Sequence, residues 1–95
     1  MMSDERYVRN ASIFDASLGP EETALLSAAQ GKYYSLNGPA GRIWELLANP
    51  MSIAAICDAL IAEFDVDAET CRRETVELIG ELLADDLIQK VARSS

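Results

Sequence analysis

The sequence contains no histidine and only two cysteines, Cys57 and Cys71, among its 95 residues. It therefore has no imidazole for acid–base catalysis near neutral pH or for zinc binding. Neither cysteine belongs to a metal-binding motif, and the chain has no phosphate-binding glycine loop and no nucleophile motif. We expect a protein with no catalytic residue, no metal and no cofactor. Both cysteines fall at apolar positions of helical patterns, which predicts small buried side chains.

Basic residues are also scarce, since 8 Lys and Arg face 16 Asp and Glu, for a net charge of −8. Such a field repels phosphate backbones and anionic lipid surfaces. No apolar run approaches the roughly 20 residues of a membrane-spanning helix. Residues 1–6 lack the apolar core of a secretory signal. We therefore expect a cytoplasmic protein that binds neither nucleic acid nor membranes.

The length of the chain suits one compact domain. The pattern predicts a flexible N-terminus over residues 1–10, a single domain over 11–91 and a tail over 92–95. Short apolar runs bounded by turn residues predict three strands near 11–18, 23–28 and 32–36. Gly31 suits a hairpin loop that needs a positive φ. These strands would form an antiparallel meander.

After residue 37 the apolar residues recur at helical spacing. This periodicity predicts helices near 38–48, 53–64 and 68–84, followed by a short extended segment at 87–91. Asn37, Ser52 and Asp67 are the expected N-caps, and Trp44 lies on the apolar stripe of the first helix. The resulting fold class is α+β: a winged helix-turn-helix with an N-terminal three-stranded antiparallel sheet followed by three helices.

In a winged helix-turn-helix the third helix usually reads DNA. Between residues 67 and 86, however, this chain has seven acidic residues and only two basic ones, Arg72 and Arg73. A reading helix needs Lys or Arg against the phosphates. An acidic winged-helix transcription regulator is thus kept as an alternative from another functional class.

The sheet points to a peptide-binding role instead. If the strand at 32–36 is an edge, its unpaired backbone groups accept an extended peptide as a further strand. Alternation places Tyr34 and Leu36 toward the helices, and Tyr33 and Ser35 outward. Two alternatives are that the N-terminal segment covers this edge, or that a partner chain covers it in a structural subunit. The predicted peptide-binding residues are Lys32, Tyr33, Tyr34, Ser35, Leu36, Arg72, Arg73, Thr75, Val76 and Ile79.

An ordered series of short motifs resembles the PqqD-like proteins, which are precursor-peptide recognition elements. The series comprises Gly-Lys-Tyr-Tyr-Ser-Leu-Asn at 31–37, Gly-Arg-Ile-Trp-Glu-Leu-Leu at 41–47, Phe-Asp-Val-Asp at 64–67 and Leu-Leu-Ala-Asp-Asp-Leu-Ile at 82–88. The resemblance covers about residues 12–91. One departure is Asp86, since many members have a glycine before the final Leu-Ile. Aspartate fits a left-handed helix cap less easily than glycine.

The resemblance implies a non-catalytic protein that binds the leader segment of a ribosomally made precursor peptide. The leader would add to the strand at 32–36 beside the third helix, and the protein would present it to a processing enzyme. The tyrosine-rich strand is most similar to the stand-alone recognition proteins of lasso-peptide biosynthesis, whose partner is a leader peptidase. The alternative within the family is a peptide chaperone for pyrroloquinoline quinone biosynthesis that works with a radical SAM enzyme.

Overall fold

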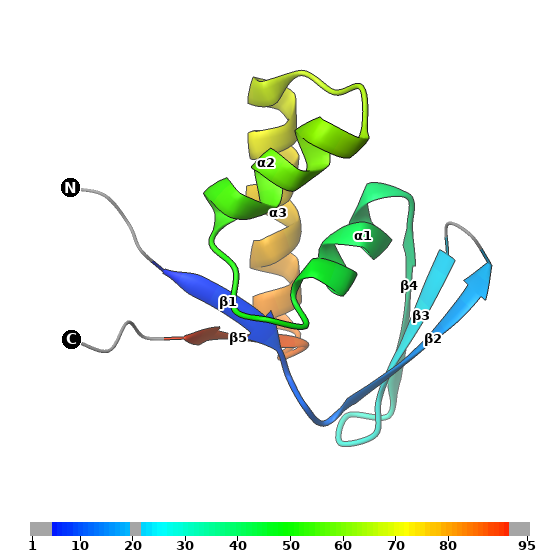
Figure 1. The fold of residues 1–95 in the computed structure, drawn as a ribbon. Coiled ribbons are helices and arrows are strands. Elements are labelled where there is room, and N and C mark those ends of the chain that lie inside the picture. The colour runs from blue at the N-terminus through cyan, green and yellow to red at the C-terminus, as the bar shows by residue number, and fades with distance from the viewer. Residues whose placement is uncertain (1–4, 20–21, 92–95) are drawn as a thin grey trace.

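The computed structural model describes residues 5–19 and 22–91, which fold into two small sheets and three helices (Figure 1). In chain order the elements are β1 (Arg6–Arg9), β2 (Ile13–Gly19), β3 (Glu22–Ser27), β4 (Lys32–Asn37), α1 (Pro39–Leu46), α2 (Ile53–Glu63), α3 (Ala68–Ala84) and β5 (Ile88–Val91). The predicted α+β class, with a three-stranded antiparallel sheet followed by three helices, is therefore confirmed. None of the helices in the described ranges is both long and apolar enough to span a bilayer.

The strands β2, β3 and β4 form the meander, in that order and all antiparallel. The hairpin between β3 and β4 turns at Gly31, whose φ is +66° and whose N–H donates to the Ser27 carbonyl. In Figure 1 this sheet lies on one side of the molecule, with α1 between it and the α2–α3 pair.

A second sheet, β1 with β5, corrects the prediction of a flexible N-terminus for residues 6–9 of the predicted range 1–10, and residues 1–4 lie outside the described residues. Residues 6–9 form β1, and Tyr7 is buried while its backbone exchanges two hydrogen bonds with Met51. The backbone partners of β1 are Leu47, Met51 and β5, all distant in the sequence, so no local pattern predicts this strand. The predicted tail at 92–95 lies outside the described residues.

Two of the three predicted helix caps are confirmed. The Ser52 hydroxyl accepts from the Ala55 N–H, and the Asp67 carboxylate accepts from the Thr70 N–H. The bond from Thr70 also lowers the pKa of Asp67. The predicted cap Asn37 is instead the last residue of β4, and Gly38 (φ 57°) precedes α1 without a side-chain cap. Gly38 makes the sharp turn from strand to helix, for which its missing Cβ is an advantage.

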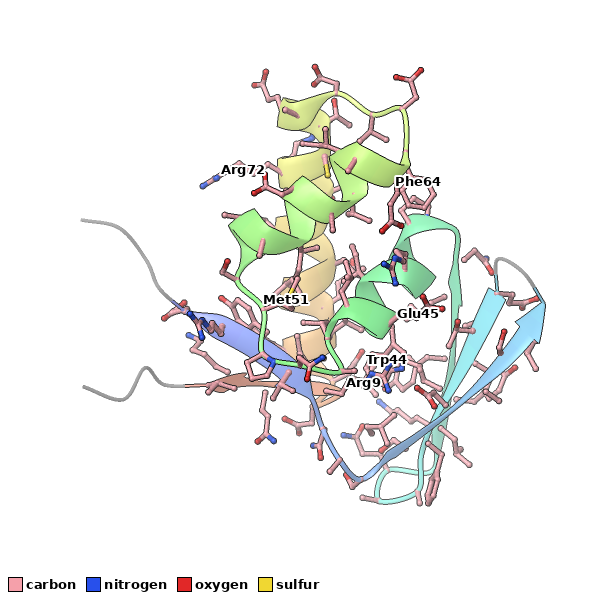
Figure 2. All side chains as sticks on the ribbon, viewed as in Figure 1. Arg9, Trp44, Glu45, Met51, Phe64 and Arg72 are labelled. Atoms are coloured by element: carbon pink, nitrogen blue, oxygen red, sulfur yellow. The ribbon has the colours of Figure 1, made fainter. Side chains whose placement is uncertain are left out.

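The core forms where the helices meet the inner face of the meander, and Trp44 is 1% exposed at its centre. The Trp44 indole N–H donates to the Asp15 carboxylate over 2.6 Å. Arg9 pairs with the same carboxylate, lies 5.1 Å from the Trp44 ring centre and donates to the Trp44 carbonyl. Figure 2 shows Arg9 and Trp44 side by side. This cluster joins β1, β2 and α1.

The two cysteines are buried and free, as predicted: Cys57 is 8% exposed and Cys71 is 5% exposed. Burial raises the pKa of the Cys57 thiol.

The end of α3 shows how the chain accommodates Asp86 at a position where a glycine is common. The Leu87 N–H donates to the Leu82 carbonyl, and the Asp86 N–H donates to the Leu83 carbonyl. This pair of bonds defines a Schellman motif, in which the residue after the cap takes the left-handed conformation. Asp86 has a φ of 60°, the one positive φ among the described non-glycine residues. The chain therefore holds an aspartate in a conformation that favours glycine.

We predict that Asp86→Gly raises the free energy of unfolding by about 0.5–1 kcal/mol, because it relieves the left-handed strain of a residue with a Cβ. Urea unfolding measures the change. The matched control is Asp85→Gly, one residue earlier at a φ of −98°, where glycine brings no relief and lowers stability. If D86G were no more stable than the parent, the left-handed conformation of Asp86 would not be a source of strain.

The two neighbouring tyrosines of β4 lie on opposite faces, as the alternation predicts. Tyr33 is 64% exposed on the outer face, whereas Tyr34 packs against the core. The Tyr34 hydroxyl is buried and has no hydrogen-bond partner among the described residues. A buried hydroxyl without a partner costs free energy in the folded state.

Tyr34→Phe is expected to raise the free energy of unfolding by about 1 kcal/mol, since it removes this unsatisfied group and keeps the ring. Thermal or urea unfolding provides the measurement. Tyr33→Phe, the control on the exposed face, should change stability by less than about 0.5 kcal/mol. A clear loss of stability in Y34F would mean that the hydroxyl is satisfied in solution.

Candidate functional site

Strand β4 is an edge strand of the meander, because the described residues pair it with β3 on one side alone. Its six residues extend over about 16–20 Å at the rise of a β-strand. Alternate residues of such a strand direct their N–H and C=O groups away from the sheet. The alternative that the N-terminal segment covers this edge does not hold for the described residues, since β1 pairs with β5 in the other sheet.

Helix α3 lies beyond this edge and borders it with one stripe of side chains. The stripe consists of Glu74, Leu78, Glu81 and Asp85, spaced by four, three and four residues and thus on one face of the helix. At one end Glu74 and Leu78 line a cavity together with Asn37, the last residue of β4. At the other end the Asp85 carbonyl accepts a 3.0 Å hydrogen bond from the Gln30 side chain in the β3–β4 hairpin.

The two ends of the α3 stripe thus lie at the two ends of β4, and helix and strand run in opposite directions. From residue 74 to residue 85 the helix rises by about 16 Å, which nearly matches the length of β4. The strand packs mainly on β3 and α1, whereas α3 packs on α2 and β5. The arrangement leaves the free edge of β4 facing the stripe.

The cavity has a volume of about 270 Å³ and its lining is mostly apolar. It lies where the start of α1, the end of α2 and the first half of α3 meet, and Phe64 occupies its rim near α1 in Figure 2. Its lining residues are Asn37, Pro39, Ala40, Ile43, Leu60, Phe64, Val66, Cys71, Glu74, Thr75 and Leu78. A pocket of this kind suits one large apolar side chain.

A larger cavity, of about 520 Å³, lies on the other side of α1 and includes Glu22, Arg42 and Glu45. Arg42 makes a two-pronged ion pair with Glu63 over 2.8 Å and a further contact with Glu45. This pairing raises the pKa of Arg42 and lowers the pKa of Glu63. Arg42 is the one cation among the described residues that line this cavity, and these ion pairs already occupy it.

The structure places the predicted strand residues Lys32, Tyr33, Tyr34, Ser35 and Leu36 together in β4. Tyr34 and Leu36 face the helices, and Tyr33 and Ser35 face outward, where the Ser35 hydroxyl donates to Glu22.

The predicted residues of α3 are scattered over its circumference. Thr75 lines the cavity but is only 1% exposed, and Ile79 is buried in the core. Arg72 and Val76 share the flank opposite Glu74 and Leu78, and Arg72 projects away from the three-stranded sheet in Figure 2. Arg73 faces solvent on the side of the helix away from the core. Arg72, Arg73 and Val76 thus lie on faces of α3 other than the stripe, and Ile79 is closed off in the core.

Of the residues that line the apolar cavity, the sequence singled out only Thr75 as peptide-binding, and it did not single out the α3 stripe. The apolar period of α3 showed which face is buried, but two flanks border that face. Choosing between them requires knowing on which side β4 lies. The one available signal was the spacing of the three acidic residues around Leu78, which places their carboxylates together.

Comparison with protein families finds a match to the family described as coenzyme PQQ synthesis protein D (PqqD), over residues 22–88. Comparison with curated proteins finds no match. Among solved structures, TbiB1 in complex with the TbiA(beta) leader peptide superposes with a TM-score of 0.80 at 28% identity, covering 90% of this chain and 99% of TbiB1. A lasso peptide synthetase B1 complexed with the leader peptide has a TM-score of 0.74 at 23% identity, covering 87% and 96% of the two chains, and shares the fold. Because the family match spans most of the chain and includes β4, the cavity and the α3 stripe, the protein belongs to the PqqD family.

Proposed function

We propose that this protein binds the leader segment of a ribosomally made precursor peptide as an added strand on the edge of β4. The observation that carries the proposal is the free edge of β4 facing α3, with an apolar cavity at its end. The similar protein TbiB1 was solved with a leader peptide, which supports the same class of ligand here.

Strand addition suits this site because the backbone supplies most of the affinity. An extended peptide that pairs with β4 satisfies N–H and C=O groups that otherwise bond only to water. The strand β4 is long enough for a peptide of about six residues to pair along it.

The cavity at the end of β4 would determine which side chain of the leader peptide binds best at that position. An extended peptide directs alternate side chains to the same face, so one of them reaches the cavity between α1 and α3. Its lining by Ile43, Leu60 and Phe64 suits an aromatic or large aliphatic residue. Such an anchor sets the register of the leader on the strand.

The protein acts in this proposal without catalysis, as a single-domain winged helix-turn-helix scaffold in the cytoplasm. It holds the leader and presents the remainder of the precursor to a processing enzyme. We propose the leader peptidase of a lasso-peptide pathway as this enzyme, since the tyrosine-rich strand resembles lasso-peptide recognition proteins and a lasso peptide synthetase B1 shares the fold. The alternative partner is a radical SAM enzyme of pyrroloquinoline quinone biosynthesis, which the name of the family suggests.

A displayed library of random 16-residue peptides, selected on the purified protein, tests the binding mode. We expect enriched peptides that carry an aromatic or large aliphatic anchor. Ala40→Trp fills the cavity and should weaken their binding about tenfold or more, because the anchor loses its place. The matched control is Ala54→Trp on the exposed surface of α2, which should leave binding unchanged.

Isothermal titration with synthetic copies of the enriched peptides gives the affinities, and thermal unfolding checks that both variants fold. Equal affinities for A40W and A54W would exclude the cavity as the anchor site. A library in which no peptide is enriched would contradict peptide binding itself.

A further inference from the structure

We propose that the α3 stripe makes this protein selective for leaders that carry lysine or arginine beside the apolar anchor, on the side toward the β3–β4 hairpin. The inference rests on the proposed function and specifies its ligand. It follows from the charge and spacing of Glu74, Glu81 and Asp85 relative to β4 and the cavity.

The three carboxylates of the stripe are available for a ligand. None of them takes part in an ion pair within residues 5–19 and 22–91, whereas Asp15, Glu45 and Glu63 all do. Glu74 and Glu81 are exposed, and Asp85 is partly exposed. Three acidic side chains on one helix face repel one another unless a cation lies between them. A peptide that brings cations relieves this repulsion.

None of the basic residues within 5–19 and 22–91 forms an ion pair with the stripe. Arg72 and Arg73 lie on other faces of α3 by helical spacing, and Arg42 is held by Glu63 and Glu45. Lys32, at the hairpin end of β4, forms no ion pair with any described residue. The net charge of −8 adds a general attraction for cationic peptides and a repulsion of acidic ones.

The spacing of the stripe defines where the basic residues belong. Along the helix Glu81 lies about 4–5 Å beyond Leu78, and Asp85 lies about 6 Å further. Side chains of an extended peptide that share a face recur about every 6.6 Å. With the anchor in the cavity beside Leu78, the next one or two side chains on that face come opposite Glu81 and Asp85. Leaders therefore carry Lys or Arg about two and four residues from the anchor.

A leader peptide with these basic residues binds the site more tightly than a neutral peptide does. A charge-assisted hydrogen bond between a carboxylate and Lys or Arg is stronger than one between neutral groups. Beside the apolar cavity and under a bound strand, the pair is also partly shielded from water and salt. Backbone pairing along β4 does not depend on the sequence of the peptide. The acidic stripe therefore supplies the selectivity for basic peptides that β4 alone does not provide.

The test compares library selections on three proteins: the parent, Glu81→Lys, and the control Asp58→Lys. Asp58 is exposed on α2, forms no ion pair with the described residues and lies on the side of α2 opposite Leu60, so D58K changes the net charge equally without touching the stripe. We expect Lys and Arg to be enriched near the anchor on the parent and on D58K, and this preference to be lost or reversed on E81K. For a synthetic basic peptide, E81K should weaken binding about fivefold or more, and D58K less than twofold.

Amide NMR spectra of each complex test strand addition at β4 separately from the selectivity for basic peptides. Peptides that shift the amides of β4 but show no basic preference, or the same preference on E81K and D58K, would overturn the charge selectivity and leave strand addition standing. Peptides that fail to shift β4 at all would overturn both.

Discussion

The arrangement of this small protein depends on the cluster of Trp44, Asp15 and Arg9. One buried indole, one carboxylate and one guanidinium join α1, β2 and β1 through direct contacts. Because Asp15 lies on the inner face of the meander, opposite Leu25, these bonds tie the three-stranded sheet to α1 and β1. The same sheet carries β4 at its other edge, antiparallel to the α3 stripe.

In the proposed function, the site combines two kinds of recognition. The edge of β4 pairs its backbone with any extended chain and sets the direction of the ligand. The cavity and the stripe offer one apolar and three acidic features at defined spacing, and these distinguish one sequence from another. The similar protein TbiB1 was solved in complex with a leader peptide.

Much of the fold was predictable from the sequence because its signals are local. The bounds of α3 and the caps Ser52 and Asp67 follow from side chains that bond within three residues, and the two faces of β4 follow from simple alternation. The strand β1 was not predictable, since its stability comes from Met51 and β5. The cap at Asn37 was wrong because the strand runs one residue further and Gly38 makes the turn. The sequence did not show which flank of α3 borders β4, because that depends on where β4 lies, which is a tertiary property.

The central claim is that a peptide extends the sheet at β4, and amide hydrogen exchange tests it most directly. The protein is compared alone and saturated with a peptide enriched from the library. Strand addition predicts slower exchange at alternate residues of β4, whose N–H groups point to the free edge, and no change along β2, the opposite edge of the same sheet. Slower exchange along β2, or unchanged exchange along β4 in the saturated complex, would contradict the account.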